Sequence, residues 1–329
     1  MNEVTRKVSA YIVRENDKGY DELLVFSHKD YPDVPLQIPG GTVEENEELI
    51  SALKREIHEE TGLTEFKIIK ELGEIFYCNE LNEQFNRHFY LVRVSKNTKD
   101  IWEHEVSGKG EDNGLIFSYS WYDPQEVLLI YKRDCHFLSR KFIPSLFPDE
   151  VMLGLSNEKV SLMPDDEYWR EKFRNEKKII QEKIKDKNII IEHIGSTAIP
   201  GIPAKPIIDI GIGIYKSINI EGLIKSLEEI GYRYKGENGI SGRYYFVKGK
   251  PENRKFHIHM FEVNHPDWKN HLLFRDYLIE NDEFAKDYGE LKLKNWKLHI
   301  EDRKGYTDSK NSFIQKVLKK AKKDKKICG

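Results

Sequence analysis

The stretch that decides the fold of the first half of this chain runs from Gly41 to Leu63 and reads GTVEENEELISALKREIHEETGL. Apolar residues recur in it at helical spacing, at Ile50, Leu53 and Ile57. This spacing predicts a helix over residues 47–61, and Gly62 suits the left-handed position that commonly ends a helix.

Three carboxylates gather on one side of that predicted helix. On a helical wheel Glu56, Glu59 and Glu60 fall within an arc of about 100°. Like charges one turn apart destabilise a helix by about 0.2–0.5 kcal/mol per pair, and Arg55 offsets part of this by reaching Glu59. The cluster is tolerable on a solvated surface, or useful around a hard cation such as Mg²⁺, which prefers oxygen ligands. On periodicity alone, a solvated, glutamate-rich helix is the better interpretation.

The full order of residues resembles a known motif. Gly41, Glu47 and the run REIHEETGL at 55–63 match every fixed position of the Nudix box, and the preceding Pro39-Gly40 also suits that family. The resemblance covers about residues 5–135 and implies an α/β/α Nudix sandwich. It also implies hydrolysis of a nucleoside diphosphate linked to another group, in which water attacks phosphorus and a divalent cation, Mg²⁺ or alternatively Mn²⁺, stabilises the developing charge.

The resemblance also assigns roles within the box. Glu56, Glu59 and Glu60 are similar to the metal-binding glutamates of the family. Glu56 or Glu59 would order or deprotonate the attacking water. Arg55 is similar to the arginine that orients a glutamate, so the catalytic residues implied are Glu56, Glu59 and Arg55.

Two further groups of residues are candidates for the same site. Many Nudix proteins take another carboxylate from a later loop, and here the segment WEHEVSGKGED offers four. We favour Glu103 or Glu105 as a metal ligand over Glu111 and Asp112, although for any one of them a solvated loop carboxylate is the better interpretation. Aromatic residues that would either stack on a base or belong to the core are Tyr77, Phe85, Tyr119 and Trp121.

Elsewhere in the first half, apolar patterns predict strands at 7–13, 23–28, 74–79, 87–94 and 115–122. One helix among several strands indicates an α/β or α+β fold. The segment 142–157 has two prolines and no clean period, which favours a domain boundary there. We therefore expect a domain at 1–145, a linker at 146–157 and a second domain at 158–329.

The second half holds its own candidate site, in IEHIGSTAIPGIPAKPIIDIGIGI at 191–214. The pattern is a strand, a Gly-Ser turn, a Pro/Gly loop with a lysine, and a buried strand with one carboxylate. Backbone N–H groups of such a turn can cradle a phosphate, and the same pattern also suits a purely structural turn. The candidate anion-binding residues in this segment are Gly195, Ser196, Thr197, Lys205 and Asp209.

Several runs of the second half resemble the GrpB (UPF0157) family from about residue 158 to residue 322. They are HIGSTAIPGIPAKPIIDI at 193–210, GISGRYYF at 239–246, HIHM at 257–260, FRDYLIEND at 274–282 and YTDSK at 306–310. The resemblance implies a nucleotidyltransferase-like α/β fold. Polar residues in or near these runs that could gather on one anionic ligand are Arg243, His257, His259, Arg275, Lys292, Tyr306 and Lys310.

One position departs from the nucleotidyltransferase pattern. Such enzymes place two carboxylates, separated by one residue, after their Gly-Ser turn. Here Asp209 is followed at that spacing by Gly211, which argues against two-metal nucleotidyl transfer. The paired histidines His257 and His259 share one strand face and could bind a metal or a phosphate, or be hydrogen-bonded structurally.

The remaining elements of the second half follow from apolar periodicity. Helices are predicted at 165–185, 221–230, 267–280, 282–298 and 308–323, and strands at 188–194, 207–214, 243–248 and 255–263.

Composition limits the function classes. The chain has 329 residues with 39% hydrophobic and 12% aromatic residues, enough for two cores and not typical of a disordered chain. It contains no run of about 18 uncharged apolar residues, and its first thirty residues lack a basic head followed by an apolar segment, so we expect neither a membrane span nor a secretory signal. The three cysteines Cys78, Cys135 and Cys328 are scattered, which favours a reducing cytoplasm.

Charge is divided unevenly between the halves. Residues 1–150 hold 18 Lys and Arg against 29 Asp and Glu, a net of −11, and residues 151–329 hold 35 against 27, a net of +8. An acidic half acting on an anion needs a bound cation, whereas a basic half can hold an anion directly. The basic end of the chain suits a solvated helix end better than nucleic-acid binding. Its lysines are Lys319, Lys320, Lys322, Lys323, Lys325 and Lys326, opposed by Asp324.

Three functions remain open at this point. The first is a Mg²⁺-dependent hydrolase acting on a nucleotide-linked small molecule, with a second domain that binds or modifies an anionic ligand. In the second, the GrpB-like half is a regulatory nucleotide-binding module. The third, RNA 5′-end processing on the basic tail, is the least favoured. The Nudix resemblance is also compatible with a homodimer.

Overall fold

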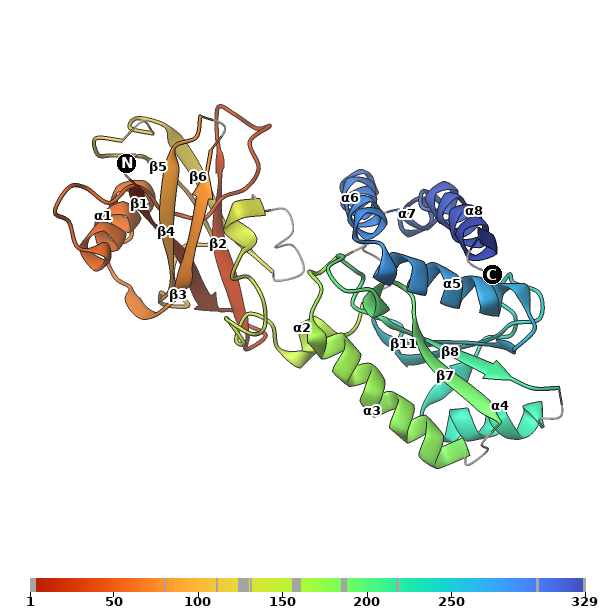
Figure 1. Cartoon of the computed structure of the whole chain (residues 1–329). Coiled ribbons are helices and arrows are strands. Elements are labelled where there is room, and N and C mark those ends of the chain that lie inside the picture. The colour runs from red at the N-terminus through yellow and green to blue at the C-terminus, as the bar shows by residue number, and fades with distance from the viewer. Residues whose placement is uncertain are drawn as a thin grey trace. The chain divides into compact units, whose positions relative to one another are not determined.

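The computed structural model describes residues 4–79, 81–110, 112–123, 130, 132–155, 161–184, 188–216, 219–299 and 302–327 (Figure 1). Glu111, Cys328 and the side chains of Lys325 and Lys326 lie outside the described residues. The chain divides into two compact units, Met1–Pro148 and Asp149–Gly329. The finer boundaries at residues 145 and 158 stay a prediction.

The first unit is built on a six-stranded sheet with the order β3-β4-β1-β2-β6-β5. Strand β1 pairs parallel with β4, and the other neighbours pair antiparallel. Its elements are β1 (Thr5–Glu15), β2 (Asp21–His28), α1 (Leu49–Thr61), β3 (Lys67–Cys78), β4 (Gln84–Arg93), β5 (Ile101–Glu105), β6 (Ile116–Tyr122) and the 3₁₀ turn η2 (Lys132–Cys135).

Alternation along β1 supplies the two faces of this sheet. One face packs against Leu53 and Ile57 of α1, in a buried cluster to which β1 contributes Val8, Ala10 and Ile12. On the other face Tyr11 stacks on Phe89, with ring centroids 5.7 Å apart, and Phe89 meets Phe137 from the segment after η2. The mixed α/β class is confirmed for this unit.

Two strands of the first unit differ from the prediction. The expected strand at 74–79 begins at Lys67, and its register shifts twice against β4, which breaks the alternation that a sequence pattern relies on. Residues 101–105 were expected in a loop and form strand β5, paired with β6. The charged residues of IWEHE do not form a typical strand pattern. The strand tolerates them because β5 lies at the edge of the sheet, where its outer face can be polar.

The second unit is built on a five-stranded sheet with the order β7-β8-β11-β10-β9. Strands β8 and β11 pair parallel, and the other neighbours pair antiparallel. Its elements are α2 (Asp149–Met152), α3 (Glu167–Ile184), β7 (Ile189–Ile194), η3 (Ser196–Ala198), β8 (Ile208–Ile214), α4 (Ile220–Glu229), β9 (Tyr232–Tyr234), β10 (Tyr244–Lys250), β11 (Asn253–Glu262), α5 (Pro266–Glu280), α6 (Asp282–Leu298), α7 (Arg303–Asp308) and α8 (Asn311–Ile327).

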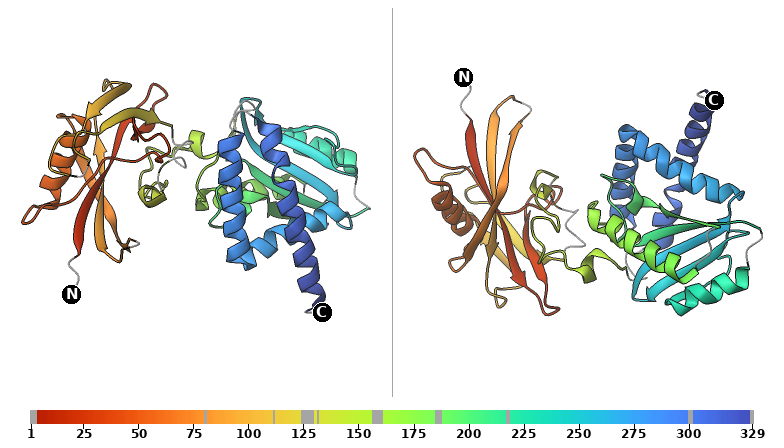
Figure 2. Two further views of the ribbon diagram at one scale, coloured as in Figure 1. Left: turned by 90° about the horizontal axis from the view of Figure 1, so that it is seen from above. Right: turned by 60° about the horizontal axis from the view of Figure 1, so that its bottom comes forward.

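Helices cover both faces of this second sheet. Helices α3 and α4 lie on one side, and α5 lies on the other, with α6 and α8 packed beyond it (Figures 1 and 2). Strand β8 presents isoleucines to one side and Asp209, Gly211 and Gly213 to the α5 side. The glycines let α5 approach closely: a Cβ at Gly211 would lie 3.0 Å from the ring of Trp268, and one at Gly213 would lie 2.7 Å from it.

The expected single helix at 308–323 is wrong at its start. The structure has α7 up to Asp308 and then α8 from Asn311. The hydroxyl of Ser309 donates to the carbonyl oxygen of Tyr306 at 2.9 Å, a local bond that competes with helix continuation. The break places Tyr306 and Lys310 beside the sheet.

The described end of α8 carries an apolar and a basic side. Ala321, with Val317, belongs to a buried cluster shared with α5 and α6, whereas Lys319, Lys320, Lys322 and Lys323 are exposed. Asp324 pairs with Lys320 at 3.3 Å and accepts from the hydroxyl of Tyr277 at 3.0 Å. Among the described helices, none combines the length and the hydropathy required to cross a bilayer.

Candidate functional site

The first unit contains a cavity of about 750 Å³ beside helix α1. Glu56, Glu59 and Glu60 all line it, as the wheel predicts. The loop containing Gly40 and Gly41 forms another part of its wall, together with the ends of β1, β2 and β4. The carboxylates of the box therefore face one space large enough for a small ligand.

Arg55 fixes the carboxylates on the rim of this cavity. Its guanidinium donates to Glu56 and to Glu59, both at 3.0 Å, and holds Glu47 through two bonds of 3.0 and 2.8 Å. It also donates to the carbonyl oxygen of Thr42 at 2.9 Å. The resemblance implied that Arg55 orients one glutamate. In the structure its planar guanidinium donates to three glutamates.

The glycine pair before the helix brings backbone against the carboxylates. The N–H of Gly40 donates to Glu60 at 2.9 Å. A Cβ at Gly41 would lie 2.2 Å from a carboxylate oxygen of Glu56, and a Cβ at Gly40 would lie 2.2 Å from the carbonyl oxygen of Val8. These close approaches explain why glycine stands at both positions of the motif.

Burial changes the acidity of two of the glutamates. Desolvation raises the pKa of Glu60 well above its ordinary value, against the opposing hydrogen bond from Gly40. Desolvation also raises the pKa of Glu56, although the neighbouring Arg55 lowers it in part. Burial therefore favours the protonated, neutral forms of these two carboxyls, and a bound cation would favour the charged forms that act as metal ligands.

Among the described candidates on the later loop, Asp112 lines this cavity, which Glu44, Glu83 and Asp134 also line. Glu103 and Glu105, the favoured candidates, do not line the cavity, because they lie on strand β5. The carboxylate of Glu103 is instead paired with Lys29 at 2.6 Å on the surface. The loop after β5 returns toward α1, where the N–H of Ser107 donates to the carbonyl oxygen of Glu59 at 3.0 Å, and this brings Asp112 to the site.

The donor set suits a hard divalent cation. Glu56, Glu59, Glu60 and Asp112 offer carboxylate oxygens, the ligand type that Mg²⁺ and Mn²⁺ prefer. These oxygens are directed partly toward Arg55 and Gly40, so a cation would draw Glu56 and Glu59 away from the guanidinium. The residues present fit such a cation.

The aromatic candidates of the first unit separate into two groups. Phe85 lines the cavity, stacks on Tyr77 with ring centroids 5.1 Å apart and lies 5.3 Å from the ammonium group of Lys7, whereas Tyr77 does not line the cavity. Tyr119 is fully buried, and its hydroxyl donates to the carbonyl oxygen of Glu60 at 2.9 Å. Trp121 donates to the carbonyl oxygen of Lys99 and does not line the cavity.

A second cavity, of about 270 Å³, lies in the second unit on the α5 side of its sheet. It gathers most of the candidate anion-binding residues from four separate segments. Its lining is Ser196, Thr197, Lys205, Ile207, Asp209, His257, Lys292, Tyr306, Thr307 and Lys310. Ile207 and Thr307 were not predicted, since neither carries a distinctive chemical signal.

Three lysines converge on this small space. Lys292 of α6 is 1% exposed, and its ammonium group has no hydrogen-bond partner among the described residues. Lys205 and Lys310 place their ammonium groups 4.4 and 4.2 Å from the centre of the same Tyr306 ring. Desolvation lowers the pKa of Lys292 well below its ordinary value and that of Lys310 to about 8.

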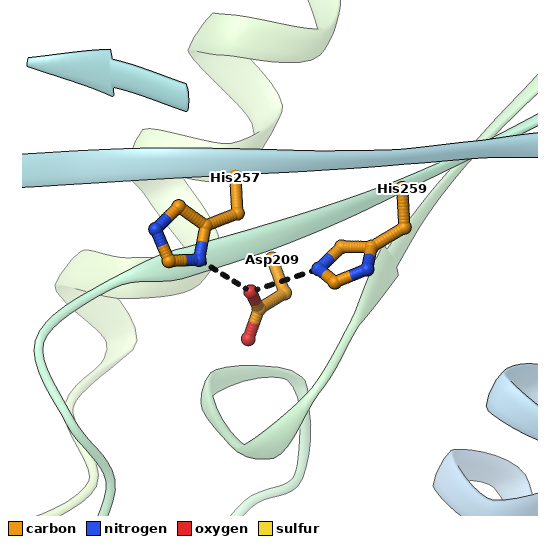
Figure 3. A group of neighbouring side chains, drawn as sticks. All are labelled: Asp209, His257 and His259. Atoms are coloured by element: carbon orange, nitrogen blue, oxygen red, sulfur yellow. Dashed lines mark hydrogen bonds and ion pairs between the residues drawn. The ribbon is translucent and has the colours of Figure 1, made fainter. Parts of the chain in front are cut away.

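Asp209 is the acidic group of this cavity. Its carboxylate lies 3.3 Å from Nδ1 of His257 and 3.4 Å from Nε2 of His259, as Figure 3 shows. A Cβ at Gly195 would lie 2.5 Å from the same carboxylate, and Gly195 has a φ of 72°, so the predicted turn glycine is required there. Desolvation alone would raise the pKa of Asp209, but the hydrogen bonds from the two histidines hold it below its ordinary value.

The same three residues could in principle hold a metal ion, since one ligand atom from each lies within 4.8 Å of the others. A tetrahedral Zn²⁺ site needs donor atoms about 3.3 Å apart, as follows from bond lengths of about 2.0–2.1 Å. Arg243 argues against such a site, because its guanidinium lies 3.3 Å from Nδ1 of His259 and can only donate. With Arg243 donating to Nδ1, Nε2 of His259 carries a proton toward Asp209, which accepts the hydrogen bond.

The structure excludes the second carboxylate of the nucleotidyltransferase pattern on steric grounds. Gly211 occupies that position, and Trp268 fills the space into which a side chain would extend. Arg243 also stays outside the cavity lining and acts through His259. Arg275 was expected at the ligand and lies elsewhere: it donates to Glu192 and to the carbonyl oxygen of His193.

Comparison with known proteins finds two families in this chain. The model of the family described as "NUDIX domain" matches residues 5–146, and that of the "GrpB protein" family matches residues 159–320.

Three curated relatives illustrate the two matches. The UPF0157 protein YqkA of Bacillus subtilis is 39% identical over 51% of this chain and 49% of its own length. The glutamate-rich protein GrpB of Alkalihalophilus pseudofirmus is 36% identical over 51% of this chain and 98% of its own. A Rattus norvegicus protein described as diphosphoinositol polyphosphate phosphohydrolase 2 is 28% identical over 44% of this chain and 73% of its own. The chain thus spans about half the length of YqkA and nearly all of the GrpB protein.

Proposed function

We propose that this chain, which belongs to the GrpB family and carries a NUDIX domain ahead of its GrpB domain, is a pyrophosphohydrolase dependent on a divalent cation. Its substrate is a nucleoside diphosphate joined to a second group. The observation that supports the proposal most is the convergence of Glu56, Glu59, Glu60 and Asp112 on one cavity. Basic side chains on the same walls, Lys7, Arg87 and Lys109, suit the phosphates of such a substrate.

The residues of the box suggest how the reaction proceeds. A bound Mg²⁺ or Mn²⁺ would neutralise phosphate oxygens and make a bound water more acidic. Glu56 or Glu59 accepts a proton from the attacking water, whose oxygen bonds to one phosphorus while the bridging P–O bond breaks. Arg55 positions both glutamates, and the products are two phosphate monoesters or, from a nucleoside triphosphate, a monoester and pyrophosphate.

A substrate panel tests this proposal. The purified chain is incubated with Mg²⁺ and nucleoside triphosphates, their oxidised forms, nucleotide sugars, ADP-ribose, dinucleoside polyphosphates, diphosphoinositol polyphosphates and capped RNA. Products are identified by mass, with Glu59→Gln as the inactive variant and Glu48→Gln as the matched control. Glu48 is exposed, makes no capping hydrogen bond and does not line the cavity. We expect cleavage that is lost in Glu59→Gln alone, and equal rates in both variants would refute the proposal.

A second function for the GrpB domain is binding of a nucleotide or another anionic ligand. It is supported by the lysine-lined cavity of the second unit. Nucleotidyl transfer by two metal ions is less well supported, because Trp268 occupies the place of a second carboxylate. RNA binding by α8 would show as a steep loss of affinity with added salt.

A further inference from the structure

The cavity of the GrpB domain is assembled against an electrostatic cost. Among the described residues that line it, the charged side chains apart from His257 are three lysines and one aspartate, a surplus of two positive charges when all three lysines are protonated. Lys205 and Lys310 share one aromatic ring, and Lys292 is buried without a hydrogen-bond partner among the described residues. Burial and like-charge repulsion favour loss of a proton from these lysines, and a bound anion would stabilise their charged forms.

The fold holds these ammonium groups in place. Tyr306 is fully buried and fixes Lys205 and Lys310 over its ring, while Lys292 lies 5.3 Å from the ring centre of Tyr288. Each lysine comes from a different segment: the loop after η3, helix α6 and the turn between α7 and α8. Long side chains lose conformational entropy when they are ordered, so their convergence on one space indicates a ligand and not a solvated surface.

We infer that this cavity binds the dianionic phosphate of a phosphate monoester directly, without a metal ion. A monoester carries a charge of about −1.5 to −2 near neutral pH, which matches the surplus of two positive charges. A phosphate diester carries only one charge. The hydroxyl of Ser196, which also lines the cavity, can provide a further donor for a phosphate oxygen.

The size of the cavity agrees with recognition of the phosphate itself. Its volume of about 270 Å³ lies just below the usual range of sites for whole drug-sized ligands, about 300–1,000 Å³. Among the described lining residues, Tyr306 is the single aromatic side chain, and its ring already faces Lys205 and Lys310. The pocket therefore selects a terminal phosphate, whereas most of the attached group remains outside.

The inference connects the two domains chemically, and in this respect alone it rests on the proposed function. Hydrolysis of a diphosphate linkage in a nucleoside diphosphate derivative releases two phosphate monoesters, the class of compound that this cavity fits. The binding itself does not depend on that hydrolysis, so it is measured in a chain that cannot hydrolyse.

The experiment compares two nucleotides that differ in the phosphate group. The full-length Glu59→Gln chain is titrated calorimetrically with AMP, a monoester, and with 3′,5′-cyclic AMP, a diester, in the presence of EDTA. We expect AMP to bind at least tenfold more tightly than cyclic AMP. Equal affinities, or binding of AMP that requires added Zn²⁺ or Mg²⁺, would overturn the inference.

Substitutions locate the binding. Lys292→Met removes the buried ammonium group, and Lys294→Met, on an exposed position of the same helix, is its control. AMP affinity should fall at least tenfold in the first variant and stay unchanged in the second. If Lys292→Met does not fold, Lys310→Met provides the same comparison. An AMP affinity unchanged by the lysine substitutions would place the site elsewhere and refute the inference. Failure of the wild-type chain to hydrolyse any compound of the panel, with AMP binding intact, would refute only the hydrolase.

Discussion

The backbone of Gly41 lies against the carboxylate of Glu56 so closely that a Cβ on this glycine would stand 2.2 Å from a carboxylate oxygen. The two residues are fifteen positions apart, and their contact joins the loop after β2 to helix α1. Gly41 therefore sets the position of a proposed metal ligand, in addition to forming a turn.

This contact predicts the effect of Gly41→Ala. The new methyl group must displace the carboxylate of Glu56 from its present position, because the two would otherwise lie closer than any tolerated Cβ contact. We expect hydrolysis to fall at least tenfold, with a higher Mg²⁺ concentration needed for half-maximal rate. The measurement is a Mg²⁺ titration of the rate beside a circular dichroism melt, and a rate equal to wild type in a folded variant would contradict the assignment.

Glu56→Gln and Glu59→Gln should each lower kcat by about 10²–10⁴, because each removes a carboxylate that accepts a proton or holds the cation. Glu48→Gln makes the same change of charge on an exposed position and should leave kcat unchanged. Steady-state rates at saturating Mg²⁺ provide the comparison. If all three variants lost activity alike, the loss would reflect net charge and not the site.

Substitution of Asp112 should change the Mg²⁺ requirement of hydrolysis, whereas substitution of Glu103 or Glu105 should not. We expect Asp112→Asn to raise the Mg²⁺ requirement several-fold, since only this carboxylate of the three lines the cavity. Glu103→Gln breaks a surface pair with Lys29 and should change neither rate nor Mg²⁺ dependence measurably. A larger effect of Glu103→Gln than of Asp112→Asn on the Mg²⁺ requirement would instead indicate a metal ligand on strand β5.

Arg55→Lys keeps the positive charge and loses the fork that binds Glu47, Glu56 and Glu59 at once. We expect a loss of about 1–3 kcal/mol in the free energy of unfolding of the first unit, together with a tenfold or larger loss of rate. Differential scanning calorimetry measures the loss of stability, and steady-state kinetics measures the loss of rate. Lys54→Gln, an exposed change on the same helix, should affect neither; a lysine that sustains full activity would show that the charge alone suffices.

Two histidines of the second unit should stay neutral in mild acid. Burial lowers the pKa of His193 to about 3 and that of His271 to about 4, against an ordinary value of 6.5. The unfolded chain therefore binds more protons than the folded chain between pH 6.5 and pH 4, so these two groups reduce stability as the pH falls through that window. NMR titration of the imidazole signals should show two rings still uncharged at pH 5, and titration of every ring near 6.5 would contradict this burial.

Local patterns predicted the parts of the molecule that local chemistry controls. The helix of the Nudix box follows from the spacing of Leu53 and Ile57, and its three glutamates face the cavity because helical geometry leaves no other arrangement. Gly62 ends the helix with a φ of 72°, as expected. The segment-by-segment resemblance to GrpB likewise marked the three lysines that the fold later brings together.

Features that depend on the path of the chain could not be predicted from the sequence. Asp112 reaches the first cavity through a loop whose course is fixed by the bond between Ser107 and Glu59, and no pattern distinguishes it from Glu103. Trp268 contacts Gly211, 57 positions away in the sequence. The sequence showed only that Gly211 stands where a second carboxylate was expected, and it gave no sign of this contact. Tyr306 was marked as polar, whereas its ring is the surface that holds two lysines.

The most direct test of the hydrolase is the fate of solvent oxygen. The chain is supplied with Mg²⁺ and the substrate that it cleaves from the panel, in water enriched in ¹⁸O, and the products are weighed by mass spectrometry. The account predicts one ¹⁸O atom in the phosphate of a single product, and no such product from Glu59→Gln. Failure of the folded, Mg²⁺-loaded chain to cleave any member of the panel, or cleavage without incorporation of solvent oxygen, would contradict it.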